Sequence, residues 1–234
     1  MSTLYLYGVT RPRALPARLA QQGISLVGSG DRAAIVSPVE ASPVEATRRN
    51  LLAHADVVEE LHEQVVVLPA RFGIVLPDRA AVVEFLGAPE LERLLELHRD
   101  TAELTLKASY EDSVFAELAP GLAALREAYR RAPTLEHGLA LGEAVAAGLA
   151  DRRARDSSRV LELLEALVLD VRVGEPEGER GALNLALLVQ RAAVDAISAQ
   201  LDRLADELSP PLRFKLVGPL PLYSFVDLEL PVAA

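Results

Sequence analysis

The hydrophobic pattern of the first third of the chain alternates between strand and helix periods. Residues 4–9 form a short apolar and aromatic run that predicts a β-strand. Residues 14–21 predict a short helix, and Gly23 is placed as its C-terminal stop. Residues 24–27 and 33–36 flank a Gly-rich turn, so a β-hairpin is expected there.

A direct repeat follows, because residues 37–41 (SPVEA) recur at once as residues 42–46. Each copy offers Ser as N-cap, Pro at the first helical position and Glu three residues after the Ser, which is a capping box. Both copies predict a helix start, so the start stays ambiguous between them. The apolar face of this helix is predicted to consist of Leu51, Ala55, Val58, Leu61 and Val65.

Residues 65–68 predict a further strand, which completes a strand-helix-strand-strand-helix-strand order. This is the βαββαβ order of a ferredoxin-like arrangement, and we assign it to an N-terminal domain at residues 1–77. Residues 78–86 and 88–99 predict two short helices. They are expected to form a helical connection at residues 78–100.

The second half of the chain predicts the same order again. Residues 101–107 alternate, with Ala102, Leu104 and Leu106 on one face and Glu103, Thr105 and Lys107 on the other. A long helical region follows, interrupted at Pro120-Gly121 and Pro133-Thr134, with its longest piece at residues 135–166. The remaining elements are predicted as strands at 167–173, 182–189 and 212–217 and a helix at 191–208.

The fold class predicted from these elements is α+β. We expect two domains, each a ferredoxin-like βαββαβ arrangement. The second domain, at residues 101–234, is expected to have an enlarged helical connection with long helices and a C-terminal tail. The Leu- and Ala-rich run at residues 182–189 also suits a helix, so its identity is left open.

Composition narrows the class of protein. The chain has 234 residues, of which 50% are hydrophobic and 25% charged, so it is long and apolar enough to bury a core. It has no Cys, which excludes disulfides and thiolate metal sites. A net charge of −10 argues against nucleic-acid and anionic-membrane partners, and no apolar run reaches the ~18–20 residues of a membrane span. With no secretory signal in the first residues, we expect a cytoplasmic protein.

Candidate chemistry is sparse. His54 and His62 lie roughly two helical turns apart, too far to share one metal ion. Glu59, His62 and Glu63 have ligand-compatible spacing, but such clusters are typical of solvated helix faces, so no metal site is predicted. The densest basic run, residues 151–156, mixes arginines with acids and contains no aromatic, which favours an exposed helix with local ion pairs over a nucleic-acid site.

Motifs of enzymes and cofactor sites are likewise missing from the sequence. Gly28-Ser29-Gly30 lacks the third glycine and following helix of a dinucleotide site, and there is no phosphate loop or Gly-x-Ser-x-Gly elbow. We therefore predict no catalytic residue and no cofactor. An enzyme that uses a pair of carboxylates remains a lesser alternative, without a pair that the sequence singles out.

The most distinctive segments are residues 68–73 (LPARFG) and 218–226 (GPLPLYSFV), which set Pro and Gly against aromatics directly after apolar runs. Such segments end strands in constrained loops. Their rings are interpreted first as core packing at strand ends and second as part of a protein-docking patch. Arg71 is the candidate for a polar contact, either with loop carbonyls or with a partner.

Together with residues 5–9 (YLYGV), these segments resemble the gas vesicle protein GvpF/GvpL family over nearly the whole chain. The chain departs from the family's usual ending, which carries a Trp and a second adjacent Pro, at Leu220 and Leu222. The family-motif residues, with structural or partner-docking roles expected, are Tyr5, Tyr7, Gly8, Leu68, Pro69, Arg71, Phe72, Gly73, Gly218, Pro219, Pro221, Tyr223 and Phe225.

This resemblance implies a minor, non-enzymatic component that assembles gas vesicles and binds the hydrophobic shell protein GvpA and other accessory gas vesicle proteins. It also implies residence at the vesicle, on the gas-facing side of the shell. The alternative is a ferredoxin-like regulatory module that binds a small ligand, which rests on analogy of fold alone.

Overall fold

The computed structural model describes residues 3–40, 43–207 and 212–228. The chain forms two compact units, one of Met1–Leu104 with Gly218–Ala234 and the other of Thr105–Val217. The chain therefore passes from one unit to the other twice, and the segment from Gly218, assigned by sequence to the second domain, belongs by its contacts to the first unit.

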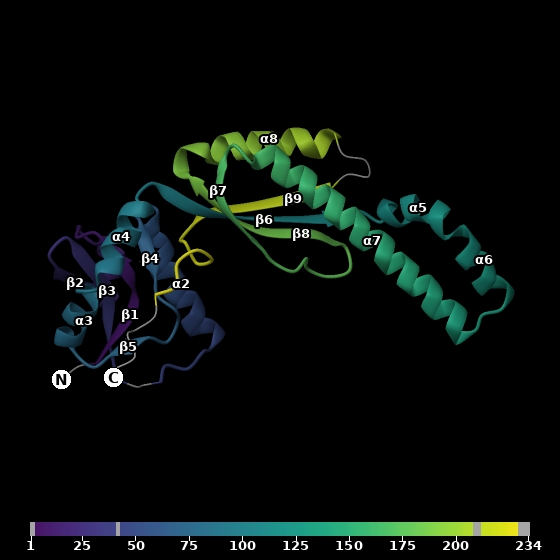
Figure 1. The fold of residues 1–234 in the computed structure, drawn as a ribbon. Helices are drawn as coiled ribbons and strands as arrows, with labels where there is room; N and C mark the ends of the chain where they lie inside the picture. The colour runs from purple at the N-terminus through teal and green to yellow at the C-terminus, as the bar shows by residue number, and fades with distance from the viewer. Residues whose placement is uncertain (1–2, 41–42, 208–211, 229–234) are drawn as a thin grey trace. The chain divides into compact units, whose positions relative to one another are not determined.

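The first unit contains an antiparallel sheet with the strand order β2-β3-β1-β4 (Figure 1). Strand β1 also pairs with β5, a short strand that the sequence did not predict. The predicted order of the remaining strands along the chain is confirmed. The strands are β1 (Thr3–Thr10), β2 (Ser25–Ser29), β3 (Arg32–Val39), β4 (Val67–Pro69) and β5 (Val75–Leu76).

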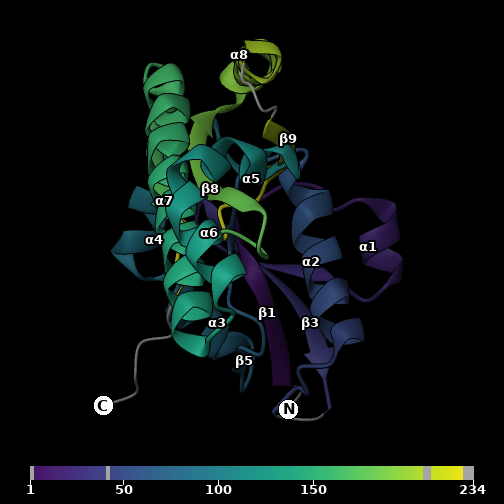
Figure 2. The ribbon, with the colours of Figure 1, turned by 90° about the vertical axis from the view of Figure 1, so that its right-hand side faces the viewer.

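Helices pack on both sides of this sheet. Figure 2 shows α1 and α2 on one side and α3 on the other. Leu19 of α1, Leu61 of α2 and Ile35 of β3 share a core cluster in which each is 0% exposed. The helices are α1 (Ala17–Gln21), α2 (Arg48–His62), α3 (Arg79–Leu86) and α4 (Pro89–Leu97).

The predicted start of α2 is wrong. The helix begins at Arg48, and its N-cap is Thr47, whose side chain accepts a hydrogen bond from the Asn50 N–H. The first SPVEA copy is instead drawn into β3, where Pro38 pairs with Leu4 of β1. In the second copy, residues 43–46 are not helical, and residues 41–42 lie outside the described part of the chain. Pairing with β1 thus overrides the local capping signal.

The buried face of α2 also differs from the prediction. Val58 and Leu61 are buried as expected, but Leu51 is 44% exposed. His54 and His62 are buried instead. The assignment of His62 to a solvated face is therefore wrong, although Glu59 and Glu63 beside it are exposed. Two imidazole rings complete a stripe that the sequence pattern assigned to aliphatic residues.

The second unit is built on a four-stranded sheet with the order β7-β8-β6-β9. The open question about residues 182–189 is answered, because they lie within a strand, β8. On β6 the predicted apolar positions are buried, but Glu103, expected on the polar face, is only 3% exposed. The strands are β6 (Thr101–Tyr110), β7 (Val168–Val173), β8 (Gly181–Gln190) and β9 (Leu212–Leu220).

The helices of the second unit extend beyond its sheet. Figure 1 shows α7 and α8 over one face of the sheet, with the first part of α7 running past it alongside α5 and α6. Figure 2 again places α6 beside α7, and the two helices are in contact. The interruptions predicted at Pro120 and Pro133 are confirmed. The helical segments are α5 (Ser113–Leu118), η1 (Ala119–Leu122), α6 (Ala123–Arg131), α7 (Leu135–Leu164), η2 (Arg191–Ala193) and α8 (Val194–Glu207).

Helix α8 is described as far as Glu207, and the last residue of its predicted range, residue 208, lies outside the described residues. Among the helices that are described, none combines the length and the apolar character needed to cross a bilayer.

Candidate functional site

The 68–73 segment leaves the sheet at its edge. Strand β4 is the last in its sheet, so Pro69, which has no N–H, can sit there without breaking a ladder of hydrogen bonds. Gly8 faces Pro69 across the pair, and a Cβ at Gly8 would lie 2.5 Å from the Leu68 carbonyl oxygen. The Ala70 N–H then donates to the Tyr7 carbonyl at 2.9 Å. Glycine at position 8 therefore permits the close approach of the two strands.

Four rings converge where this loop crosses β1 and α2. The Tyr5 ring centroid lies 4.8 Å from Tyr7, 5.6 Å from His54 and 5.9 Å from Phe72. The His54 ring also lies 5.5 Å from that of Tyr7 and 5.9 Å from that of Phe72. We call these four residues the ring cluster. It forms one wall of a shallow cavity of about 150 Å³ beside Pro38.

A directed chain of hydrogen bonds runs through the ring cluster. His54 Nε2 donates to the Ala70 carbonyl oxygen, which can only accept, at 3.1 Å. In the neutral imidazole Nδ1 is then the acceptor, and the Tyr5 hydroxyl donates to it at 2.8 Å. The Gly73 N–H in turn donates to the Tyr5 hydroxyl at 3.2 Å. Both ends of the loop, Ala70 and Gly73, are thereby tied to one Tyr-His pair.

Burial keeps this chain uncharged. Desolvation lowers the pKa of His54 below its ordinary value of 6.5, although the bond to the Ala70 carbonyl opposes the shift. Burial likewise raises the pKa of Tyr5 to about 12. A neutral Tyr donating to a neutral His is suited to fixing a loop, because both ring nitrogens of His54 are already engaged in hydrogen bonds.

The second motif is fixed on Glu103 of β6. Ser224 donates to this carboxylate from its backbone N–H at 2.7 Å and from its hydroxyl at 2.8 Å. Burial raises the pKa of Glu103, and the two bonds from Ser224 act in the opposite direction. Leu222 and Val226, on either side, are buried. The segment is therefore held by the Ser224–Glu103 hydrogen bonds, which we call the clasp, and by the burial of Leu222 and Val226.

Gly218 begins this segment with a φ of 139°, a conformation that other residues rarely adopt. The peptide bond between Gly218 and Pro219 is cis. A Cβ there would lie 2.7 Å from Leu104 Cδ2 and 2.8 Å from the Glu103 carbonyl oxygen. The position therefore requires glycine for both conformation and space.

The two motifs meet in the first unit. Ala70 and Leu228 form an isolated parallel β-bridge, and beside it Arg71 makes an ion pair with Asp227. The Arg71 and Asp227 side chains are 66% and 48% exposed. Tyr223 is 40% exposed, and Phe72 and Phe225 are half-buried. The rings are thus divided between packing and surface, and the polar head of Arg71 faces outward.

Sequence reasoning missed the residues that hold these segments. His54 carried a weak signal, because it lies at helical spacing from Val58 and Leu61 on the buried face. Glu103 and Asp227 carried none: strand alternation placed Glu103 on the polar face, and its partner lies 121 residues away. Among the described residues, no group of His, Asp and Glu has the arrangement of a metal site.

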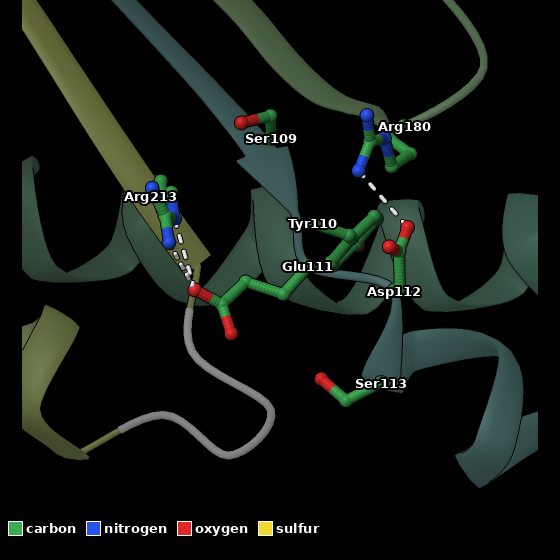
Figure 3. Close-up of a pocket in the computed structure, with 7 residues that line it drawn as sticks. All are labelled: Ser109, Tyr110, Glu111, Asp112, Ser113, Arg180 and Arg213. Atoms are coloured by element: carbon green, nitrogen blue, oxygen red, sulfur yellow. Dashed lines mark hydrogen bonds and ion pairs between the residues drawn. The ribbon is translucent and has the colours of Figure 1, made fainter.

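The second unit has a polar cavity of about 640 Å³, where β6 meets α5 (Figure 3). Arg213 binds Glu111 through two nitrogens at 2.9 and 2.7 Å, and Arg180 binds Asp112 at 2.9 Å. Two cations and two carboxylates cancel in charge. The lining therefore offers no excess charge to attract an ionic ligand.

The basic run of α7 lies nearby and is less exposed than predicted. Asp156 is only 7% exposed and accepts hydrogen bonds from the Tyr110 hydroxyl and from Arg152 Nε, both at 2.8 Å. Arg153 donates to the carbonyl oxygens of Glu179 and Gly181. The predicted local ion pairs are present, but they serve to pack α7 on the sheet.

Comparison with known proteins fits this architecture. The family described as "Gas vesicle synthesis protein GvpL/GvpF" matches residues 3–227. A protein of Streptomyces sp. (strain CB03234) named Gas vesicle protein F is 38% identical, covering 97% of this chain and 100% of that protein. Gas vesicle protein F of Dolichospermum flosaquae is 22% identical, covering 97% and 98%.

Two solved structures share the fold. The crystal structure of GvpF from Anabaena sp. PCC7120 superposes with a TM-score of 0.80 at 23% identity, covering 98% of this chain and 100% of that one. GvpF from Microcystis aeruginosa gives a TM-score of 0.75 at 22% identity, covering 97% and 100%. The fold and the sequence together define a gas vesicle protein. The chain belongs to the GvpL/GvpF family, as its three motifs predicted.

Proposed function

We propose that this protein is a non-enzymatic component of gas vesicle assembly, which binds the hydrophobic shell protein GvpA and other accessory gas vesicle proteins. The observation that carries the proposal is the family match, which extends over residues 3–227. In support, the two motifs that distinguish the chain form two packed loops, held by hydrogen bonds and by the Arg71–Asp227 ion pair. Nothing in their geometry resembles an acid–base pair or a nucleophile.

An apolar groove in the second unit is the docking surface that we propose for the shell protein. It has a volume of about 510 Å³ and lies between α5–η1 and α7. Helix α6 beside it has no fully buried residue. The apolar lining residues are Phe115, Ala116, Leu118, Ala119, Leu122, Leu141 and Val145, with Arg126 among them.

The proposed occupant is an apolar segment of the shell protein. A protein that keeps liquid water out of a gas space must present apolar surface, and such surface aggregates before assembly unless it is covered. Phe115 of α5 and Leu139 of α7 are 39% and 57% exposed, and they offer apolar contacts on the helices that line the groove. A net charge of −10 would keep the resulting complex in solution.

Co-expression with the shell protein tests this surface. Phe115→Glu introduces a charge into the groove at a position that is already partly exposed, so the fold should persist. Co-expression of the unmodified chain should raise the amount of soluble shell protein and the vesicle yield, and we expect Phe115→Glu to abolish both increases. Leu97→Glu is the matched control, because Leu97 is 60% exposed but lies on α4 of the first unit. If both variants gave the same amount of soluble shell protein and the same vesicle yield, the groove would not be the docking surface.

The motif residues are the competing location for docking. If Arg71→Ala folds normally but no longer binds the shell protein, the binding surface lies at the Arg71–Asp227 pair and not in the groove. We further propose that the protein resides on the gas-facing side of the shell. The ferredoxin-like description of each half remains a proposal that the shared strand order supports. The domain boundaries at residues 1–77, 78–100 and 101–234 also remain proposals, although the segment from Gly218 belongs by its contacts to the first unit.

The second candidate function, a small-ligand module, has its specific support in the polar cavity of about 640 Å³. A ligand there would have to exchange with the Arg213–Glu111 and Arg180–Asp112 pairs. A thermal-shift screen of metabolites with both charged and hydrogen-bonding groups tests it, since a bound ligand raises the melting temperature by mass action. A hit that Arg213→Ala abolishes would favour this function over shell-protein binding.

A further inference from the structure

Among the described strands, none pairs with the outer edge of β7. The strand is the last in its sheet, and Gly174, just after it, donates its N–H to the Asn184 carbonyl of β8 at 2.8 Å. Hydrogen bonding alternates along an antiparallel pair, so the backbone groups of Arg172 also face β8, whereas those of Val171 and Val173 face the open edge. In agreement, the Val171 N–H donates to the Asp170 carboxylate at 2.8 Å.

The sequence of this edge is complementary to itself. Around Val171, Asp170 is matched by Arg172 and Leu169 by Val173. If two copies of β7 pair antiparallel with Val171 opposite Val171, each Asp170 faces an Arg172. The register of β7 on β8 shifts between Val168 and Asp170, so the regular part of this pairing runs from Asp170 to Val173. This register also places the outward-facing backbone groups of Val171 opposite one another, as a hydrogen-bonded pair requires.

We propose that β7 pairs with β7 of a second copy of this chain, so that the two four-stranded sheets become one continuous sheet across a two-fold axis. Such an interface is isologous, and it requires the palindromic pattern that the strand carries. A strand from an unrelated partner would impose no such symmetry on the order of charges. The observation that selects a second copy as the occupant is therefore charge self-complementarity.

The side chains at this edge are those that pairing would cover. Leu169 is 54% and Val173 is 77% exposed, so pairing at this edge would remove apolar surface from water. A groove of about 380 Å³ lies beside Leu169, lined also by Leu161 and Leu164 of α7. Glu162, Glu165 and Asp170 line the groove as well, so it presents apolar and acidic side chains together to the second copy.

Asp170 and Arg172 already form an ion pair within each chain. Asp170 and Arg172 of one chain lie 3.1 Å apart, with side chains 44% and 58% exposed. Exposed pairs of this kind contribute little on their own. In the dimer each carboxylate gains the guanidinium directly opposite, and the Val171 N–H exchanges the carboxylate for a backbone carbonyl of the other strand.

Sedimentation velocity over a range of protein concentrations tests the proposal. The unmodified chain should show a reversible monomer–dimer equilibrium. Asp170→Arg makes the edge wholly cationic and Arg172→Asp makes it wholly anionic, so each alone should weaken self-association by about tenfold or more. Mixed in equal amounts, the two variants should form a heterodimer, because every facing pair is again of opposite sign. Asp202→Arg on α8 is the control for a change of net charge and should dimerise normally.

Val173→Pro tests the backbone part. The Val173 N–H faces the open edge, where proline is tolerated, so melting temperature should be kept and dimerisation lost. A chain that sediments as a monomer at all accessible concentrations overturns the proposal. Dimerisation of Asp170→Arg at the unmodified strength, or failure of the mixed variants to associate, overturns the register centred on Val171.

Discussion

The two sheets have corresponding strand orders, β2-β3-β1-β4 and β7-β8-β6-β9, but they differ in the connection that leaves the first strand of each. After β1 comes α1, a helix of 5 residues whose Leu19 enters the core. After β6 come α5, η1, α6 and α7, and the last of these alone has 30 residues. The same strand order is therefore combined with a short helix in one unit and with a long helical arm, α5 to α7, in the other.

The two connections differ in how much of their apolar surface is buried. In the first unit Leu19 of the connection and most apolar residues of the sheet are buried, so the sequence at these positions is constrained by packing. In the second unit, the arm from α5 to the start of α7 leaves Phe115, Tyr129, Leu135 and Leu139 exposed. A segment that contributes little to the core is free to change with its partners, and this is where we place binding.

The largest expected effect contrasts the two units by truncating one leucine in each. Leu61→Ala, at a side chain that is 0% exposed, should reduce the free energy of unfolding by about 2–5 kcal/mol. Leu139→Ala, at 57% exposure, should change it by less than about 0.5 kcal/mol. Urea denaturation measures both. Similar losses would show that the arm packs as tightly as the core, and the contrast would fail.

A smaller effect tests the ring cluster. Tyr5→Phe removes the donor to His54 Nδ1 and leaves a buried acceptor unsatisfied, which should cost about 1–3 kcal/mol. Tyr7→Phe is the matched control, because its hydroxyl bonds Ser37 Oγ at a less buried position, at 3.1 Å. It should cost about 0.5–1 kcal/mol. An equal cost for both variants would count against the directed chain of bonds through His54.

The smallest effect concerns pH. The pKa of His54 is lowered by burial, so the unfolded chain binds more protons below pH 6.5 than the folded chain does. Stability should therefore fall as the pH falls from 7 toward 5.5, by at most about 1.4 kcal/mol per pH unit for one group. His98 acts in the same direction, and Glu103, with its raised pKa, in the opposite one.

His54→Gln isolates the contribution of that ring, since the terms from His98 and Glu103 cancel in the difference between variant and unmodified chain. The difference in unfolding free energy between the two proteins should depend on pH below 6.5 and level off above it. A difference that is constant across this range would mean that His54 does not titrate on unfolding.

Much of the fold can be read from local signals. The alternation at residues 101–107 and the break at Pro133 act within a few residues. So does the predicted helix start at residue 78, where the Asp78 side chain accepts from the Ala81 N–H. The failures have a common cause. Ser37 and Pro38 satisfy a helix-capping rule but are recruited into β3 by β1, a partner more than 30 residues away. Pairing at a distance cannot be inferred from a capping pattern.

The candidate site shows the same division. The motif around Phe72 and the segment around Tyr223 were identified as unusual from composition alone, because Pro, Gly and aromatics coincide there. Their contacts were not predictable: Glu103 follows strand alternation yet is buried because Ser224 satisfies it. The meeting of Ala70 with Leu228 depends on the return of the C-terminal segment to the first unit.

That return has a consequence for the order in which the protein is made. The ribosome delivers residues 1–104 first, but Ser224 and Leu228, which complete the same unit, emerge only after the whole of the second unit. Until then the nascent chain holds Glu103 without its clasp and Ala70 without its bridge. The first unit is the first to begin forming and the last to be completed, so a complete first unit requires that both units have been synthesised.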